Sequence, residues 1–238
     1  MRLLLLSNSS NFGAGYLDHA AAEIAQLFAG VRRVLFVPFA LHAQADYAER
    51  ARGRLAQLGL ETEPLTEGPG APAQVEAAEG VFVGGGNTFR LLDKLQRTGA
   101  LEPLRRRVRG GVPYLGSSAG TVIAAPTLKT TNDMPIAEPA SFQALGLVPF
   151  QINCHYLDAD PASRHMGETR EQRLAEFLED NDVPVVGLRE GAWLSVEGAP
   201  RPSVTLGGGA GARIFRRGLP PVEFTPPARL DGLAEVSL

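Results

Sequence analysis

The chain has 238 residues, of which 44% are hydrophobic, and a formal net charge of −3. This length and apolar content suit one large α/β domain or two small ones with a sizeable core. The slightly acidic balance gives no electrostatic basis for binding nucleic acid or an anionic membrane, and a single cysteine excludes an intrachain disulfide.

The first half of the chain alternates short apolar runs with amphipathic segments. The apolar start, Met1–Leu6, is too short for a signal peptide and is interpreted as a buried strand over Leu3–Leu6. No segment approaches the length of a membrane span, so a cytoplasmic protein is expected. Further strands are predicted at Val34–Val37, Leu60–Leu65 and Gly80–Val83. Helices are predicted at Tyr16–Phe28, Ala45–Leu58, from Thr88 onward and at Leu101–Arg109, with a loop over 67–72.

This alternation predicts an α/β fold with a doubly wound, mostly parallel sheet flanked by helices. Ligands of such sheets bind beyond the carboxyl ends of the strands. The turn Gly84–Gly86 follows one of these strands and lies at that edge. It lacks the spacing of a dinucleotide fingerprint and the lysine of a P-loop. Gly85 and Gly86 are therefore predicted to form part of an oxyanion hole.

A candidate nucleophile follows the next apolar run, Val112–Leu115. The chain continues as Gly116-Ser117-Ser118-Ala119-Gly120 and then as residues that can start a helix. Strand, sharp turn and helix are the context of a nucleophile elbow, in which the central serine, Ser118, exposes its hydroxyl at the sheet edge. The N–H of Ala119 would face the same point and stabilise an oxyanion. Ser117 is interpreted as a turn hydroxyl.

The second half of the chain is less regular. It is expected to contain loops at 130–135 and 158–167, strands at Val148–His155 and Val183–Leu188, and a helix at Glu168–Glu179. Short strands are expected between 193 and 215, with a hairpin loop at Gly207–Gly211. The Pro-rich tail, 220–238, is expected to be loosely extended. No repeat or linker divides the chain, so residues 1–238 are predicted to form one domain.

A serine nucleophile needs a base, and the chain offers four histidines. His19 lies in the first predicted helix, where a surface role is expected, and His165 lies in a polar loop. His42 follows the second strand and could approach the site. His155 ends a strand after the nucleophile in the chain and is the favoured base.

The base needs an orienting acid, for which Glu190 and Asp133 are the candidates. Glu190 follows a strand that ends at the functional edge, whereas Asp133 lies in a polar loop. Cys154 is a rival nucleophile, but alternation along the strand would turn it away from His155, so a buried thiol is favoured. No motif supports a metal or cofactor.

Seven stretches carry a family resemblance: Leu3–Ser9, Val83–Phe89, Gly116–Gly120, Thr130–Ile136, Gln151–His155, Gly167–Arg173 and Glu190–Trp193. Together they resemble the peptidase E, or α-aspartyl dipeptidase, family. The blocks Thr-Thr-Asn-Asp-Met-Pro and Gly-Glu-Thr-Arg-Glu-Gln-Arg are far more specific than the elbow. The resemblance implies a cytoplasmic serine peptidase with a fold akin to class I glutamine amidotransferases. Such an enzyme removes aspartate from the N-terminus of Asp-X dipeptides, and its relatives are often homodimers.

The resemblance also implies roles for individual residues. Ser118 becomes the nucleophile, His155 the base and Glu190 the third member of a triad. Arg170 is the choice for binding the substrate's β-carboxylate, because arginine offers a planar pair of donors. Asn87 and Asp133 are the other predicted substrate-binding residues.

Two positions depart from the family pattern, and three alternatives stay open. Ser117 stands where relatives carry a bulkier aromatic residue, and Cys154 where they often carry proline, which bears on the shape of the pocket. The alternatives are a cyanophycinase-like enzyme acting on aspartyl polymers, an esterase of the α/β-hydrolase fold, and an inactive binding module of the same fold. The esterase is disfavoured because its chain order is serine, acid, histidine.

Overall fold

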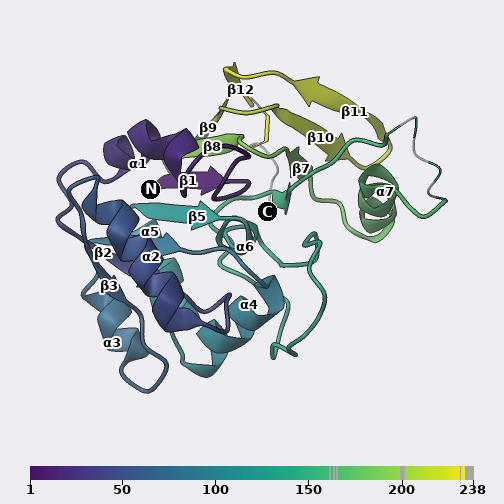
Figure 1. Cartoon of the computed structure of the whole chain (residues 1–238). Coiled ribbons are helices and arrows are strands. Elements are labelled where there is room, and N and C mark those ends of the chain that lie inside the picture. Colours follow the sequence, from purple (N-terminus) through teal and green to yellow (C-terminus); the bar gives the residue numbers. More distant parts are fainter. Residues whose placement is uncertain (161, 163, 165, 199–201, 231, 234–238) are drawn as a thin grey trace.

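The computed structural model describes residues 1–160, 162, 164, 166–198, 202–230, 232 and 233, and their strands form two sheets (Figure 1). The larger sheet has the order β12-β9-β8-β1-β5-β4-β2-β3. Its strands are β1 (Arg2–Leu6), β2 (Arg33–Val37), β3 (Glu61–Pro64), β4 (Gly80–Val83), β5 (Tyr114–Ser117), β8 (Trp193–Glu197), β9 (Ser203–Gly207) and β12 (Ala228–Arg229). The first five in chain order pair in parallel, and the last three are antiparallel.

The smaller sheet holds the strands that end near the predicted base and acid. Its order is β11-β10-β7-β6. Its strands are β6 (Gln151–Cys154), β7 (Val185–Leu188), β10 (Ala212–Arg216) and β11 (Leu219–Phe224). β6 and β7 are parallel, and β10 and β11 are added antiparallel. The predicted hairpin at Gly207–Gly211 is wrong, because β9 and β10 pair with different neighbours and this loop crosses between the sheets.

The helices follow the predicted order with two differences. They are η1 (Asp18–Ala20), α1 (Ala21–Leu27), α2 (Gln44–Ala56), α3 (Ala71–Glu76), α4 (Thr88–Arg97), α5 (Leu101–Arg109), α6 (Ala119–Val122) and α7 (Arg170–Asp180). The first helix begins later than predicted because Leu17 has a left-handed backbone, with φ 61°. The loop predicted over 67–72 ends early, because Ala71 and Pro72 form the first turn of α3, where proline fits well.

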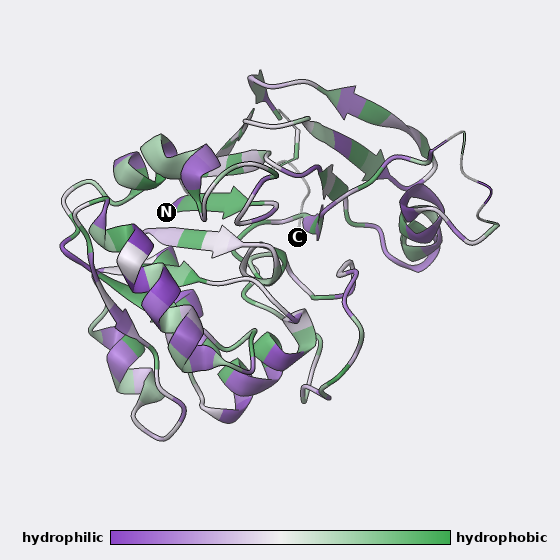
Figure 2. Ribbon diagram, viewed as in Figure 1, coloured by the Kyte–Doolittle hydropathy of each residue, from purple (hydrophilic) through white to green (hydrophobic). Residues whose placement is uncertain are grey.

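Helices cover both faces of the larger sheet, which confirms the doubly wound prediction. Side chains alternate along β1, so Leu3 and Leu5 pack with α3, α4 and α5, whereas Leu4 and Leu6 pack with α1 and α2. Figure 2 shows the apolar character of β1 and the polar outer surface of α2. This packing buries an apolar core on each side of the sheet and leaves its carboxyl edge for the site.

The tail is better packed than predicted. β11 pairs with β10, β12 pairs with β9, and Leu230 and Leu233 are buried in the core. The tail is therefore not loose over its described part, and its remaining residues, 231 and 234–238, lie outside the described residues. No helix within the described ranges is long and apolar enough to cross a bilayer.

Candidate active site

The candidate nucleophile, Ser118, lies in the sharp turn between β5 and α6. Its backbone has φ 50° and ψ −109°, a conformation that residues with a side chain rarely adopt. The Ser118 N–H donates to the Leu6 carbonyl of β1 at 3.0 Å, which ties the turn to the neighbouring strand. A Cβ at Gly120 would lie 2.1 Å from the Val83 carbonyl oxygen, so only glycine allows α6 to pack this closely on β4.

A chain of two hydrogen bonds links Ser118 to His155 and Glu190. The Ser118 Oγ lies 2.9 Å from His155 Nε2, and His155 Nδ1 lies 2.7 Å from Glu190 Oε1. A carboxylate only accepts hydrogen bonds, so Nδ1 carries the proton and Nε2 is free to accept from the serine hydroxyl. This is the arrangement that makes a serine nucleophilic. The site opens to solvent, with 40% of the His155 side chain and 56% of the Glu190 side chain exposed.

Backbone strain is concentrated at this site. Three non-glycine residues of the described chain have positive φ, and two of them are Ser118 and His155, at 50° and 52°. Such residues cost about 1–3 kcal/mol each and persist where the surrounding structure holds them. The left-handed turn at His155 swings its ring out of the line of β6 and toward Ser118.

The loop after β1 supplies two supporting residues that sequence reasoning missed. Ser7 is fully buried; its Oγ accepts from the His155 N–H at 2.9 Å and donates to the Leu188 carbonyl at 2.8 Å. Asn8 is also buried, and its Oδ1 accepts from the Gly191 N–H at 2.7 Å. Ser7 thus fixes the backbone of the base, and Asn8 fixes the turn that carries Glu190. Their signal in the sequence is a polar stretch directly after a strand at the functional edge.

The predicted oxyanion donors are the backbone amides of Gly85, Gly86 and Ala119. The Ala119 N–H is the first of α6 and has no acceptor within that helix. A Cβ at Gly85 would lie 3.0 Å from the Ser118 Cβ, so the Gly84–Gly86 turn runs against the nucleophile. This turn and the start of α6 therefore lie on either side of the Ser118 side chain, where an oxyanion would form.

The predicted residues Asn87 and Asp133 hold the polar loop onto the start of α4. One carboxylate oxygen of Asp133 accepts from the Thr88 N–H at 2.7 Å and from the Thr88 hydroxyl at 2.6 Å. Asn87 caps the helix by accepting from the Arg90 N–H, and its amide donates to the Met134 carbonyl at 2.8 Å. Asp133 makes no contact with His155 among the described hydrogen bonds, so Glu190 is the acid that the structure brings to the base.

Cys154 and Ser117 flank the triad without joining it. Cys154 is buried, as predicted, and its Sγ lies 3.6 Å from the Ser118 carbonyl oxygen. Burial raises the pKa of the Cys154 thiol well above its usual range, which disfavours a thiolate nucleophile. Cys154 Sγ meets the backbone carbonyl of Ser118, whereas His155 Nε2 meets the Ser118 hydroxyl. Ser117 is the last residue of β5 rather than a turn residue, and its hydroxyl is buried without a hydrogen-bond partner in the described chain.

The two other histidines of the described chain, His19 and His42, make no hydrogen bond to the triad among the described residues. His42 is exposed, and none of the described side-chain hydrogen bonds joins it to the triad. The expected surface role of His19 is wrong, because both of its ring nitrogens are buried without a partner among the described residues. His165 lies outside the described residues.

Arg170 begins α7, immediately after the capping residue Thr169. Burial, with a contribution from the positive charge of Arg173, lowers the pKa of the Arg170 guanidinium. Within the described residues, Arg170 forms no side-chain hydrogen bond or ion pair, whereas Arg173 pairs with Glu168 at 3.5 Å. A partly buried arginine without a carboxylate partner is suited to bind an anion.

Comparison with known proteins identifies the family. Residues 3–201 match the model of peptidase family S51. The chain belongs to this family. It is 56% identical to "Peptidase E" of Streptomyces coelicolor over 99% of this chain and 96% of that protein. It is 45% identical to "Probable alpha-aspartyl dipeptidase" of Drosophila melanogaster, over 98% of this chain and 97% of that protein.

The fold is shared with a solved peptidase structure. The structure of a peptidase from an acI-B1 Actinobacterium matches 96% of this chain and 96% of its own with a TM-score of 0.72, at 18% identity. The resemblance to the peptidase E family and the mixed α/β fold are thereby confirmed.

Proposed function

We propose that this protein is a serine dipeptidase that hydrolyses Asp-X dipeptides with an N-terminal aspartate. The observation that carries the proposal is the chain of hydrogen bonds from Ser118 through His155 to Glu190. The name of the Drosophila relative, "Probable alpha-aspartyl dipeptidase", supports the dipeptide substrate. No feature of the site favours a polymer substrate or a purely binding role.

The mechanism is acyl transfer. Ser118 Oγ attacks the carbonyl carbon of the aspartyl residue while His155 Nε2 accepts the hydroxyl proton. Glu190 holds the imidazole in the right tautomer and stabilises its positive form. The amides of Ala119 and of the Gly85–Gly86 turn stabilise the oxyanion. The C–N bond then breaks as His155 protonates the leaving amine, and water, activated by the same histidine, hydrolyses the acyl-enzyme.

Selectivity for aspartate is assigned to Arg170. Its guanidinium is partly buried and free of carboxylate partners among the described residues, so it can take the β-carboxylate in a bidentate pair. Glutamate is one methylene longer, so its carboxylate and its scissile carbonyl cannot both be placed correctly. Asn87 and Asp133 use their polar atoms within the protein, and we assign them the shaping of the binding site through the loop they hold.

A substrate panel tests this function. We expect hydrolysis of Asp-Leu, with much lower kcat/KM for Glu-Leu, Asn-Leu and Ala-Leu. A polyaspartate conjugate and a p-nitrophenyl ester complete the panel. Preference for the polymer would support a cyanophycinase-like enzyme, ester cleavage without dipeptide cleavage would support an esterase, and no turnover of any substrate would support a binding module.

Replacement of Arg170 tests the source of selectivity. Removing one partner of such a pair costs about 2–5 kcal/mol, or roughly 30-fold to several thousand-fold in kcat/KM. We expect Arg170→Met to lose Asp-Leu hydrolysis by such a factor and to change Ala-Leu hydrolysis little. Arg173→Met, on the same helix, is the matched control. An equal loss on all dipeptides would assign Arg170 to the structure or the catalytic machinery instead.

A further inference from the structure

A largely buried arginine, Arg189, stands directly before the proposed catalytic glutamate, Glu190, in the chain. Arg189 follows β7, and only 13% of its side chain is exposed. Its Nε and Nη2 donate to the two carboxylate oxygens of Asp158, each at 2.8 Å, which is a bidentate pair. The same guanidinium also pairs with both oxygens of Glu223 on β11 and donates to the Ala210 carbonyl. Hydrogen bonds to these carboxylates raise the pKa of Arg189.

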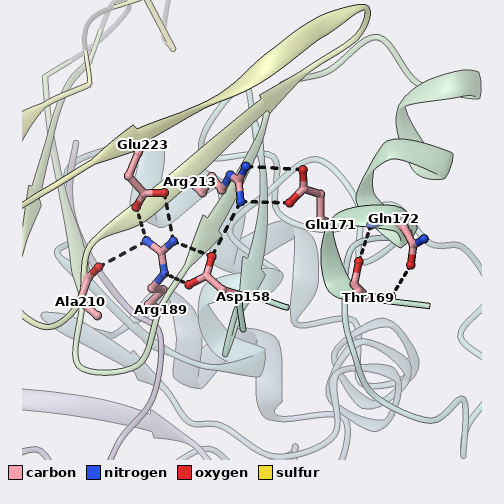
Figure 3. Close-up of polar contacts among 8 residues, drawn as sticks. All are labelled: Asp158, Thr169, Glu171, Gln172, Arg189, Ala210, Arg213 and Glu223. Atoms are coloured by element: carbon pink, nitrogen blue, oxygen red, sulfur yellow. Dashed lines mark hydrogen bonds and ion pairs between the residues drawn. The ribbon is translucent and has the colours of Figure 1, made fainter. Parts of the chain in front are cut away.

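A second arginine extends this contact to helix α7. The Nη1 atom of Arg213, on β10, lies 3.9 Å from Asp158 Oδ1 and 3.0 Å from Glu171 Oε2. Figure 3 shows the four side chains in a row, with Arg189 and Arg213 on either side of Asp158 and Glu171 at the far end. We call Arg189, Asp158, Arg213 and Glu171 the charge ladder. Hydrogen bonds from Arg189 hold the pKa of Asp158 below its usual range, so this central carboxylate stays charged.

The two ends of the charge ladder adjoin two residues of the proposed site. Arg189 is followed in the chain by Glu190, and Glu171 is preceded by Arg170. The start of α7 is itself stiff, since Thr169 and Gln172 form a capping box (Figure 3). A displacement of Glu171 would therefore carry the backbone of Arg170 with it.

The other end of α7 is held by a different arginine. Arg217, just after β10, donates to the Leu178 carbonyl at 2.7 Å and to the Glu179 carbonyl at 2.8 Å. Strand β10 and its following turn thus fix α7 at both ends, and only the Arg213 contact lies beside Arg170. This pair of contacts offers a matched comparison between two anchors of one helix.

The charge ladder does not resemble a ligand site. Each of its arginines already faces two carboxylates within the protein, so neither is available to bind an anion. A single exposed ion pair contributes little, but a connected network with a bidentate arginine has stricter geometry. A residue that binds a substrate carboxylate must be held within about 0.5 Å of its productive position. A network that fixes the backbone beside such a residue can therefore affect selectivity.

We propose that Arg213 is a positioning residue for substrate selectivity. Through its contact with Glu171 it fixes the position of Arg170. Through Asp158 and Arg189 it connects that position to the turn that carries Glu190. This inference rests on the proposed function, because it assigns Arg170 to the substrate carboxylate. Arg213 does not touch the substrate. Its effect appears only in the recognition of the charged side chain.

The test compares Arg213→Gln with Arg217→Gln by steady-state kinetics on Asp-Leu and Ala-Leu. We expect Arg213→Gln to raise KM for Asp-Leu by about 2- to 30-fold, with kcat and the Ala-Leu kcat/KM nearly unchanged. Arg217→Gln should lower the melting temperature while leaving the ratio of Asp-Leu to Ala-Leu kcat/KM at the wild-type value. Glu171→Gln removes the other side of the same contact and serves if Arg213→Gln folds poorly. An unchanged ratio in both ladder variants, or an equal change in Arg217→Gln, would overturn the inference.

A double-variant cycle gives the sharper test. In an Arg170→Met background, Arg213→Gln should cause no further loss of Asp-Leu selectivity, because both changes act on the same recognition. Additive losses would show that Arg213 acts by another route and would reject the proposal. Failure of the proposed function is seen separately: the wild-type protein would then show no preference for Asp-Leu over Ala-Leu.

Discussion

The hydroxyl of Ser7 accepts a hydrogen bond from the backbone N–H of His155 at 2.9 Å, across 148 residues of the chain. The same hydroxyl donates to the Leu188 carbonyl at the end of β7, two residues before Glu190. One buried side chain from the loop directly after β1 thus bridges the two strands of the smaller sheet that precede the base and the acid. The spacing between these two catalytic candidates depends on it.

Ser7→Ala should therefore weaken both stability and turnover. The variant leaves a buried N–H without an acceptor, which costs about 1–3 kcal/mol of unfolding free energy. It also frees the backbone of His155, and a misplacement of the base lowers kcat by about 10- to 100-fold. Urea unfolding and kinetics on Asp-Leu measure the two effects.

Ser203→Ala is the control for Ser7→Ala. The Ser203 hydroxyl makes only a 3.4 Å contact to the Glu197 carbonyl in a more exposed position, so its loss should change stability by no more than about 0.5 kcal/mol. If Ser7→Ala lowers stability but leaves kcat at the wild-type value, the bridge supports the fold without positioning the base.

Replacement of the two adjacent serines separates the nucleophile from its neighbour. Ser118→Ala removes the only hydroxyl within hydrogen-bond distance of His155 Nε2 among the described residues, so kcat should fall by roughly 10⁴-fold or more. Ser117→Ala removes a buried hydroxyl that has no partner in the described chain and should leave activity near the wild-type value. Normal hydrolysis by Ser118→Ala together with a dead Ser117→Ala would show that the nucleophile is misassigned.

The acid of the triad is tested by two isosteric variants. Glu190→Gln keeps the shape of the side chain but no longer favours the imidazolium form of His155, so kcat should fall by roughly 100- to 10⁴-fold. Asp133→Asn affects a helix start, where an amide oxygen can still accept from the Thr88 N–H, and should cost about 1 kcal/mol of stability and far less activity. The reverse ranking in kcat would identify Asp133 as the acid.

The parts of the site that the sequence predicts well are those encoded locally. The elbow around Ser118 depends on a strand, two glycines and a helix start that lie within a few residues of one another. His155 directly follows β6, and Glu190 lies two residues beyond the end of β7, which marks both for the functional edge. The homodimer and the cytoplasmic location stay predictions of the family resemblance.

The parts that the sequence does not predict depend on contacts between distant segments. The Asn8 side chain meets the Gly191 N–H across 183 residues, and the polar stretch after β1 does not show which of its residues makes this contact. The division into two sheets likewise depends on which strands pair, so the crossing from β9 to β10 reads in the sequence as a hairpin. Arg213 and Asp158 each look like a solvated surface charge until the fold brings them together.

The partly buried His19, which is not a member of the triad, gives the protein a separate dependence on pH. Both ring nitrogens of His19 are buried and unpaired among the described residues. Burial lowers the pKa of His19 from its usual value of 6.5, against the opposing charges of Glu23 and Asp18, which raise it. The unfolded chain therefore binds a proton to this ring more readily than the folded protein does. Stability is greatest above about pH 6.5 and is lost as the pH falls toward the lower pKa of the folded state.

His19→Gln should reduce this loss of stability on acidification. For each protein, urea unfolding measures the free energy of unfolding at about pH 7.5 and at about pH 5.5. The loss of free energy between the two pH values is then compared between proteins. We expect the loss of unfolding free energy on acidification to be smaller in His19→Gln than in the wild type. This expectation does not depend on how the substitution changes stability at the higher pH. His42→Gln, at an exposed position, should keep the wild-type difference. Equal pH dependence in the wild type and both variants would contradict this prediction. It would mean that the His19 ring binds a proton as readily in the folded protein as in the unfolded chain, for example by turning toward Glu23 or Asp18.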